Sequence, residues 1–60
     1  MFITRDDDGT VTLHETMPFE KTINGYKYYY SPNSIILHKF HLDESLSNGP
    51  FEIELNIKNG

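Results

Sequence analysis

The sequence predicts an all-β fold, a small antiparallel meander of five or six short strands that could also curl into a barrel. The composition supports this prediction, because Ala and Gln, which favour helices, are absent, whereas 12 of the 60 residues are Val, Ile or Thr. Asn24-Gly25 stands between two strand-like segments and is typical of a two-residue hairpin turn. Residues 51–58 alternate between apolar and polar side chains, which is the two-residue period of a strand.

The first two predicted strands cover residues 1–5 and 10–17 and are joined by an acidic turn, Asp-Asp-Asp-Gly. A four-residue turn would place Arg5 directly opposite Thr10. With this register, Phe2 lies on the same face as the Val and Leu of the second strand and away from its His.

The next two predicted strands, residues 19–23 and 26–30, form a hairpin around the Asn-Gly turn. Pairing Ile23 with Tyr26 sets the register of this hairpin. One face then carries Phe19, Ile23, Tyr26, Tyr28 and Tyr30. Tyr29 falls on the opposite face, among polar side chains.

The segment that follows, residues 35–42, has two interpretations. As a strand it is apolar on both faces, so both faces need a cover, from a curled sheet or from a partner chain. The alternative is an α+β fold with one helix at about 34–46, but that helix would open with two β-branched residues and would end near Asp43 and Glu44, where the helix dipole disfavours anions. The strand interpretation is preferred, and residues 51–58 supply the last strand.

Length and charge limit the classes of protein that this chain can represent. Sixty residues predict a single domain, 1–60, and the absence of Cys excludes disulfides and thiolate metal sites. Nine acidic and five basic residues give a formal charge of −4, which disfavours direct binding to nucleic acid or to an anionic membrane. No apolar run has the length of a membrane span or a signal peptide, so we expect a cytoplasmic protein.

The acidic turn is a candidate calcium site. Asp6, Asp8 and Glu15 have the spacing of three oxygen ligands in an EF-hand-type loop, with a glycine between them at the required position. Thr4, however, stands where the first carboxylate belongs, and only three residues precede it. The sequence therefore favours an ordinary acidic turn, with no metal and no cofactor.

The histidines are a weaker candidate metal site. His38 and His41 are three residues apart, so they share a face on a helix but not on a strand. Zinc would also require further ligands from other segments. We therefore predict ordinary strand histidines.

Two sets of residues could bind a macromolecular partner. The first consists of large side chains that are common in protein interfaces, Tyr26, Tyr28, Tyr29 and Phe40, although the tyrosines could instead cover the edge of a thin core. The second is an acidic face that could imitate the phosphates of a nucleic acid, Asp43, Glu44, Glu52 and Glu54, although Lys58 ends this row and a solvated strand face would look the same.

The chain lacks the motifs of an enzyme. It has no Cys nucleophile, no glycine-bracketed serine and no glycine-rich phosphate loop. The main hypothesis is therefore a small non-enzymatic protein-binding module, an adaptor or inhibitor of another protein, of the kind that a phage or other mobile element could encode. The alternatives are an acidic mimic that blocks a DNA- or RNA-binding enzyme, and a purely structural homo-oligomer such as a homodimer.

Overall fold

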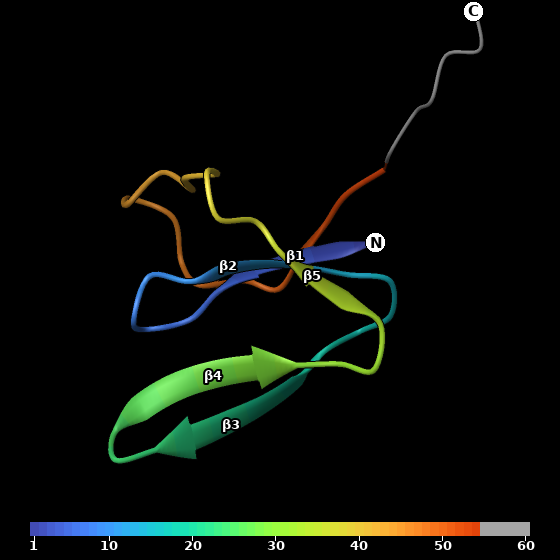
Figure 1. Ribbon diagram of the computed structural model, residues 1–60. Helices are drawn as coiled ribbons and strands as arrows, with labels where there is room; N and C mark the ends of the chain where they lie inside the picture. The colour runs from blue at the N-terminus through green and yellow to red at the C-terminus, as the bar shows by residue number, and fades with distance from the viewer. Residues whose placement is uncertain (55–60) are drawn as a thin grey trace, which may run out of the picture.

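The computed structural model describes residues 1–54, and the all-β prediction is confirmed for them. They form six short strands and no helix: β1 (Phe2–Arg5), β2 (Val11–His14), β3 (Phe19–Ile23), β4 (Tyr26–Tyr30), β5 (Ser34–Ile36) and β6 (Phe51–Glu52). Four strands form one antiparallel sheet in the order β5-β2-β1-β6, and the β3–β4 hairpin forms a second (Figure 1). Neither sheet closes, so the curled barrel is wrong for the described part of the chain.

The hairpin lies against one face of the four-stranded sheet, and the long loop of residues 37–50 lies on the other face (Figure 1). Alternation along β1 and β2 directs Thr4, Thr12 and His14 toward the hairpin and directs Ile3 and Val11 toward the loop. All five side chains are buried. The core between sheet and hairpin is therefore largely polar, and it depends on hydrogen bonds as well as apolar packing.

The register of β1 and β2 differs from the predicted one by a residue. Arg5 pairs with Val11 instead of Thr10, and Phe2 pairs with His14. The connecting turn has five residues, because the Asp6 amide donates to the Thr10 carbonyl at 2.8 Å and Gly9 adopts a φ of 95°. A shift by one residue moves Phe2 to the other face of the sheet, which it shares with His14.

The segment predicted as 35–42 is a strand only as far as Ile36, and the alternative helix at about 34–46 is wrong. The Arg5 guanidinium donates hydrogen bonds to the carbonyl oxygens of Leu42 at 3.3 Å, Asp43 at 3.2 Å and Leu46 at 2.6 Å. These hydrogen bonds hold the loop of residues 37–50 on the sheet.

The last strand is shorter than predicted. β6 contains two residues and pairs with β1, and the Ile53 amide extends this pairing by donating to the Met1 carbonyl at 2.8 Å. Of the predicted strand at 51–58, residues 55–58 lie outside the described residues. Residues 1–54 include no helix that could span a membrane.

Candidate functional site

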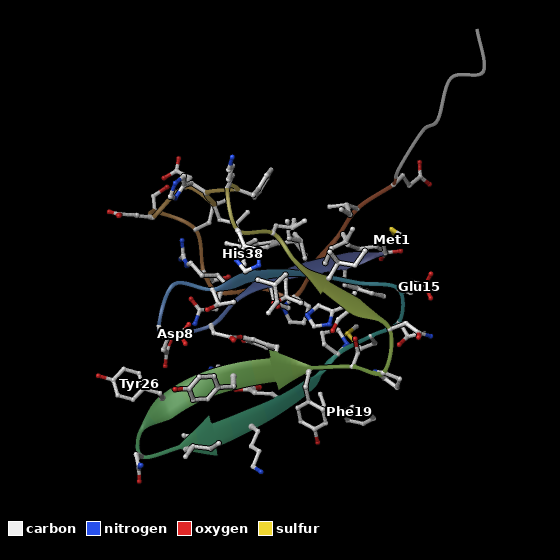
Figure 2. The ribbon with its side chains drawn as sticks, viewed as in Figure 1. Met1, Asp8, Glu15, Phe19, Tyr26 and His38 are labelled. Atoms are coloured by element: carbon white, nitrogen blue, oxygen red, sulfur yellow. The ribbon has the colours of Figure 1, made fainter. Side chains whose placement is uncertain are left out.

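The outer face of the β3–β4 hairpin, which points away from the four-stranded sheet, exposes a group of large apolar side chains. Their exposed fractions are 60% for Phe19, 46% for Ile23, 53% for Tyr26 and 54% for Tyr30. The predicted register is confirmed, because Ile23 pairs with Tyr26 and Phe19 pairs with Tyr30. We call these four side chains the hairpin face, and in Figure 2 Phe19 and Tyr26 mark its two ends.

The local sequence explains the geometry of this hairpin. Asn24 and Gly25 adopt φ angles of 51° and 82°, so both turn residues have the positive φ that a type I′ turn requires. This turn matches the twist of the two strands and fixes their register. At the other end of the hairpin, the rings of Phe19 and Tyr30 stack with their centroids 5.4 Å apart.

The charges of the hairpin are divided between its two faces. Lys21 follows the alternation of Phe19 and Ile23 and is the one charged residue on the outer side of the hairpin. Glu20 and Lys27 lie on the inner side and form an ion pair at 3.0 Å, which raises the pKa of Lys27. The outer side therefore carries a single positive charge in a chain whose formal charge is −4.

Tyr29 lies on the face opposite Tyr26, as the register predicts, but this face turns inward. Its side chain is buried against the sheet, its amide donates to the Asp6 carboxylate at 3.0 Å, and its hydroxyl donates to the Gly49 carbonyl at 3.3 Å. Burial also raises the pKa of its hydroxyl. The polar face of the hairpin is its inward face, so Tyr29 has little surface left for a partner. Tyr28 lies on the outer face but is partly buried.

Phe40 is exposed but does not join the tyrosines. It lies in the loop of residues 37–50, on the opposite side of the sheet from the hairpin (Figure 1). There it lines an open hollow of about 380 Å³ together with His38 and His41. Of the four predicted contact residues, Tyr26 therefore belongs to the hairpin face and Phe40 to this hollow, whereas Tyr28 and Tyr29 belong to neither.

The acidic turn holds the hairpin against the sheet. The Asp6 carboxylate accepts a hydrogen bond from the Tyr29 amide at 3.0 Å, and the Asp7 carboxylate accepts one from the Lys27 amide at 2.7 Å. The Asp7 amide in turn donates to the Lys27 carbonyl at 3.0 Å. The Lys27 amide and the Asn48 side chain together lower the pKa of Asp7. The turn thus pairs with the edge of β4 that faces away from β3, much as a short strand would.

This arrangement does not form the calcium site that the spacing suggested. The Asp6 carboxylate accepts a hydrogen bond from the Tyr29 amide, and the Asp8 carboxylate accepts one from the Thr10 amide at 2.9 Å. Glu15 follows β2 at the end opposite Asp8 (Figure 2). Within residues 1–54, no three His, Asp or Glu side chains converge on a possible metal position.

The structure separates His14 from the other two histidines. His14 is fully buried in β2, whereas His38 and His41 are exposed in the loop. The strand that the sequence predicted over both loop histidines ends at Ile36. Their description as strand histidines is therefore wrong, and the structure does not bring His14 to them as a third ligand.

The acidic face is spread over separate parts of the chain. Glu52 lies in β6 and Glu54 follows it, whereas Asp43 and Glu44 lie in the loop of residues 37–50. Hydrogen bonds from Ser45 and the nearby Arg5 guanidinium lower the pKa of Asp43. Arg5 therefore places a positive charge beside one of the four carboxylates, which weakens the resemblance to a row of phosphates.

Sequence reasoning missed the roles of Asp6, Asp7 and Arg5. Apart from the Asn48 side chain, their partners are backbone groups of Tyr29, Lys27 and the distant loop, and backbone groups have no sequence signature. The run of three aspartates marked the turn but did not indicate which strand it would bind.

A pair of substitutions at Asp6 tests the attachment of the hairpin. Asp6→Ala removes the acceptor of the buried Tyr29 amide, and we expect it to lower the free energy of unfolding by about 1–3 kcal/mol. Burial raises the pKa of Asp6 above its ordinary value of 3.8. The contribution of protonated Asp6 to the free energy of unfolding is therefore present at low pH and is lost as the pH rises through the pKa of the folded state. Asp6→Asn keeps an acceptor without the charge, so at neutral pH it should match or exceed the wild type.

Urea denaturation of the two variants measures this difference. Equal losses in the alanine and asparagine variants would contradict a hydrogen-bonding role for Asp6.

Comparisons with protein-family models, with curated proteins and with solved structures found no match to this chain. Its function must therefore be inferred from its own residues.

Proposed function

We propose that this chain is a small protein-binding module, an adaptor or an inhibitor, that contacts its partner through the hairpin face. The observation that carries this proposal is the exposure of Phe19, Ile23, Tyr26 and Tyr30 on one side of a single hairpin. Isolated exposed apolar side chains are common on protein surfaces, but contiguous groups of them mark interaction sites. Tyrosine is also among the residues that contribute most to binding at protein interfaces.

The charge of the hairpin indicates the chemistry of the partner. The outer side of the hairpin has Lys21 and no carboxylate. A complementary surface would be apolar and would carry a carboxylate near its centre, opposite Lys21. Base stacking on nucleic acid is disfavoured because it requires a basic groove, and a single lysine does not provide one.

The hairpin packs on the rest of the fold through its inner side and one edge, which leaves the hairpin face available for a partner. The inner side of the hairpin already packs on the sheet through Tyr29, and the acidic turn already pairs with β4. The hairpin face takes no part in either contact. A partner can therefore cover it without disturbing the fold, and its side chains should contribute to binding more than to stability.

A pair of matched variants tests this proposal. In the hairpin variant, Phe19→Ser and Tyr30→Ser are combined. In the control variant, Ile35→Ser and Ile36→Ser are combined in β5, where the exposed fractions are similar, 64% and 51%. We expect the hairpin variant to weaken the affinity for a purified partner by about 30-fold or more, as the loss of hot-spot residues does. The control variant should bind like the wild type.

The partner is identified by crosslinking from position 26 and is then titrated by calorimetry with the wild type and both variants. An unchanged affinity of the hairpin variant, or a larger loss in the control variant, would overturn the proposal.

Sedimentation equilibrium supplies the further test. A concentration-dependent dimer that only the hairpin variant dissociates would show that a second copy covers this face, which also contradicts a separate partner.

A further inference from the structure

The two edges of the β3–β4 hairpin differ in their hydrogen bonding. The backbone of Lys27 exchanges hydrogen bonds with Asp7, at 2.7 Å and 3.0 Å, and the Tyr29 amide binds Asp6. The edge of β4 is therefore occupied by the acidic turn. The edge of β3 has no such neighbour among residues 1–54, and all five residues of β3 are exposed.

The register identifies the open backbone groups of β3. Ile23 and Tyr26 enclose a two-residue turn, so they form a hydrogen-bonded pair, and such pairs alternate along an antiparallel hairpin. The amides and carbonyls of Glu20 and Thr22 must then point away from β4. Lys27 and Tyr29, their cross-strand partners, confirm this alternation, because their amides point away from β3 toward the acidic turn.

We propose that β3 binds an extended segment of the partner protein, which adds to the hairpin as a third, antiparallel strand. This inference rests on the proposed function and specifies how the partner reaches the hairpin face. Main-chain hydrogen bonds to Glu20 and Thr22 would supply affinity, and alternate side chains would supply specificity. An open strand edge of this kind is a template for pairing, which most proteins cover or block.

The side chains of β3 define the segment that fits. Phe19, Lys21 and Ile23 point to the outer side, so three alternate residues of the added strand lie opposite them. An apolar residue, a carboxylate and a second apolar residue complement these three positions. On the inner side Glu20 is already neutralised by Lys27 at 3.0 Å, so no further charge is needed there.

A second copy of this chain fits the edge poorly. Antiparallel pairing of β3 with itself can centre on Lys21, on Glu20 or on Thr22. The first register places lysine against lysine and the second places glutamate against glutamate, and both are destabilising. The third places Glu20 opposite Asn24, whose φ of 51° ends the extended conformation. The occupant is therefore a different protein.

Amide hydrogen exchange with a defined peptide tests this inference. The probe is a capped heptapeptide, Thr-Ile-Thr-Glu-Thr-Ile-Thr, and the matched control has Lys in place of its Glu. We expect the Glu peptide at millimolar concentration to slow exchange at Glu20 and Thr22 by tenfold or more. The amide of Lys21, which already bonds to β4, should change little, and the Lys peptide should protect less. Unprotected Glu20 and Thr22 amides with the Glu peptide would overturn the inference.

Two substitutions at one position then separate this inference from the proposed function. Thr22→Pro removes the outward N–H group at a position where an edge strand tolerates proline. Thr22→Val keeps that group and controls for the loss of the hydroxyl. We expect Thr22→Pro to reduce affinity for the crosslinked partner by tenfold or more and Thr22→Val to leave it unchanged.

The other outcomes of these experiments are also decisive. If Thr22→Pro binds normally and the Phe19→Ser, Tyr30→Ser variant does not, the partner covers the hairpin face without adding a strand, and only this inference fails. If neither variant loses affinity, the proposed function fails as well. Protection of Glu20 and Thr22 that grows with protein concentration, without peptide, assigns the edge to a second copy and overturns the inference.

Discussion

Replacing His14 with alanine is expected to unfold most of the protein at room temperature. The imidazole is fully buried, with Nε2 2.9 Å from the Thr4 hydroxyl and Nδ1 2.7 Å from the Ser31 hydroxyl. The substitution leaves a cavity, which costs about 2–5 kcal/mol for a large buried side chain. It also leaves Thr4 without a hydrogen-bond partner, whereas the core of a domain this small supplies only about 3–5 kcal/mol. Circular dichroism during urea denaturation measures the loss.

A glutamine at position 14 provides the matched control. Its amide can both donate and accept, so it can retain part of the link between Thr4 and Ser31. We expect His14→Gln to be more stable than His14→Ala. An alanine variant with the urea midpoint of the wild type would show that His14 does not hold the hairpin to the sheet.

The burial of His14 also predicts that the stability of the protein depends on pH. Burial lowers the pKa of His14 below its ordinary value of 6.5. The unfolded chain therefore binds a proton at pH values where the folded protein does not. The stability from neutral His14 is fully present above pH 6.5 and is lost as the pH falls through the pKa of the folded state. Denaturation from about pH 8 to about pH 5 should show this slope in the wild type and a shallower one in His14→Gln.

Replacing Gly49 with alanine is the second substitution with a large expected effect. Gly49 has a φ of +93°, and a Cβ atom there would lie 2.8 Å from the Ile3 carbonyl oxygen and 2.9 Å from the Phe51 nitrogen. Both are backbone atoms of paired strands, so relieving the collision requires β1 and β6 to separate locally. We expect a loss of about 3 kcal/mol or more, from backbone strain together with overpacking.

Gly9→Ala separates these two causes. Gly9 has a similar φ of +95°, but a Cβ atom there meets nothing within 4 Å. This variant should lose only the conformational contribution, about 1 kcal/mol. Thermal unfolding of the two variants measures the difference. Equal losses at positions 9 and 49 would show that close approach to β1 does not limit the residue at 49.

The hairpin was predictable because its determinants are local. The Asn24-Gly25 turn needs only its own two positive φ angles, and the alternation of the flanking strands follows from the adjacent residues. The shared side of Phe19, Tyr26 and Tyr30 was predicted with it, since these residues alternate along the same two strands. Cross-strand pairs set by a tight turn do not depend on the rest of the fold.

Other parts of the candidate site depended on distant groups. Tyr29 and Glu20 occupy the same face by alternation, and the sequence could not show that this face would turn inward. Arg5 and Asp6 bind carbonyls and amides that are 23 or more residues away. Such partners are backbone groups, which every residue possesses, so no residue type marks them in advance.

The sequence by itself therefore determined the all-β class, the turn at Asn24-Gly25 and the register of the hairpin, because each results from contacts between near neighbours. Tertiary structure decided the remainder. The hydrogen bonds of Arg5 tie the loop after Ile36 to the sheet, and those of Asp6 and Asp7 tie the turn after β1 to β4. Burial on the sheet gave Tyr29 a structural position and left the opposite face of the hairpin exposed, because only one side of a two-stranded ribbon can pack against the same sheet.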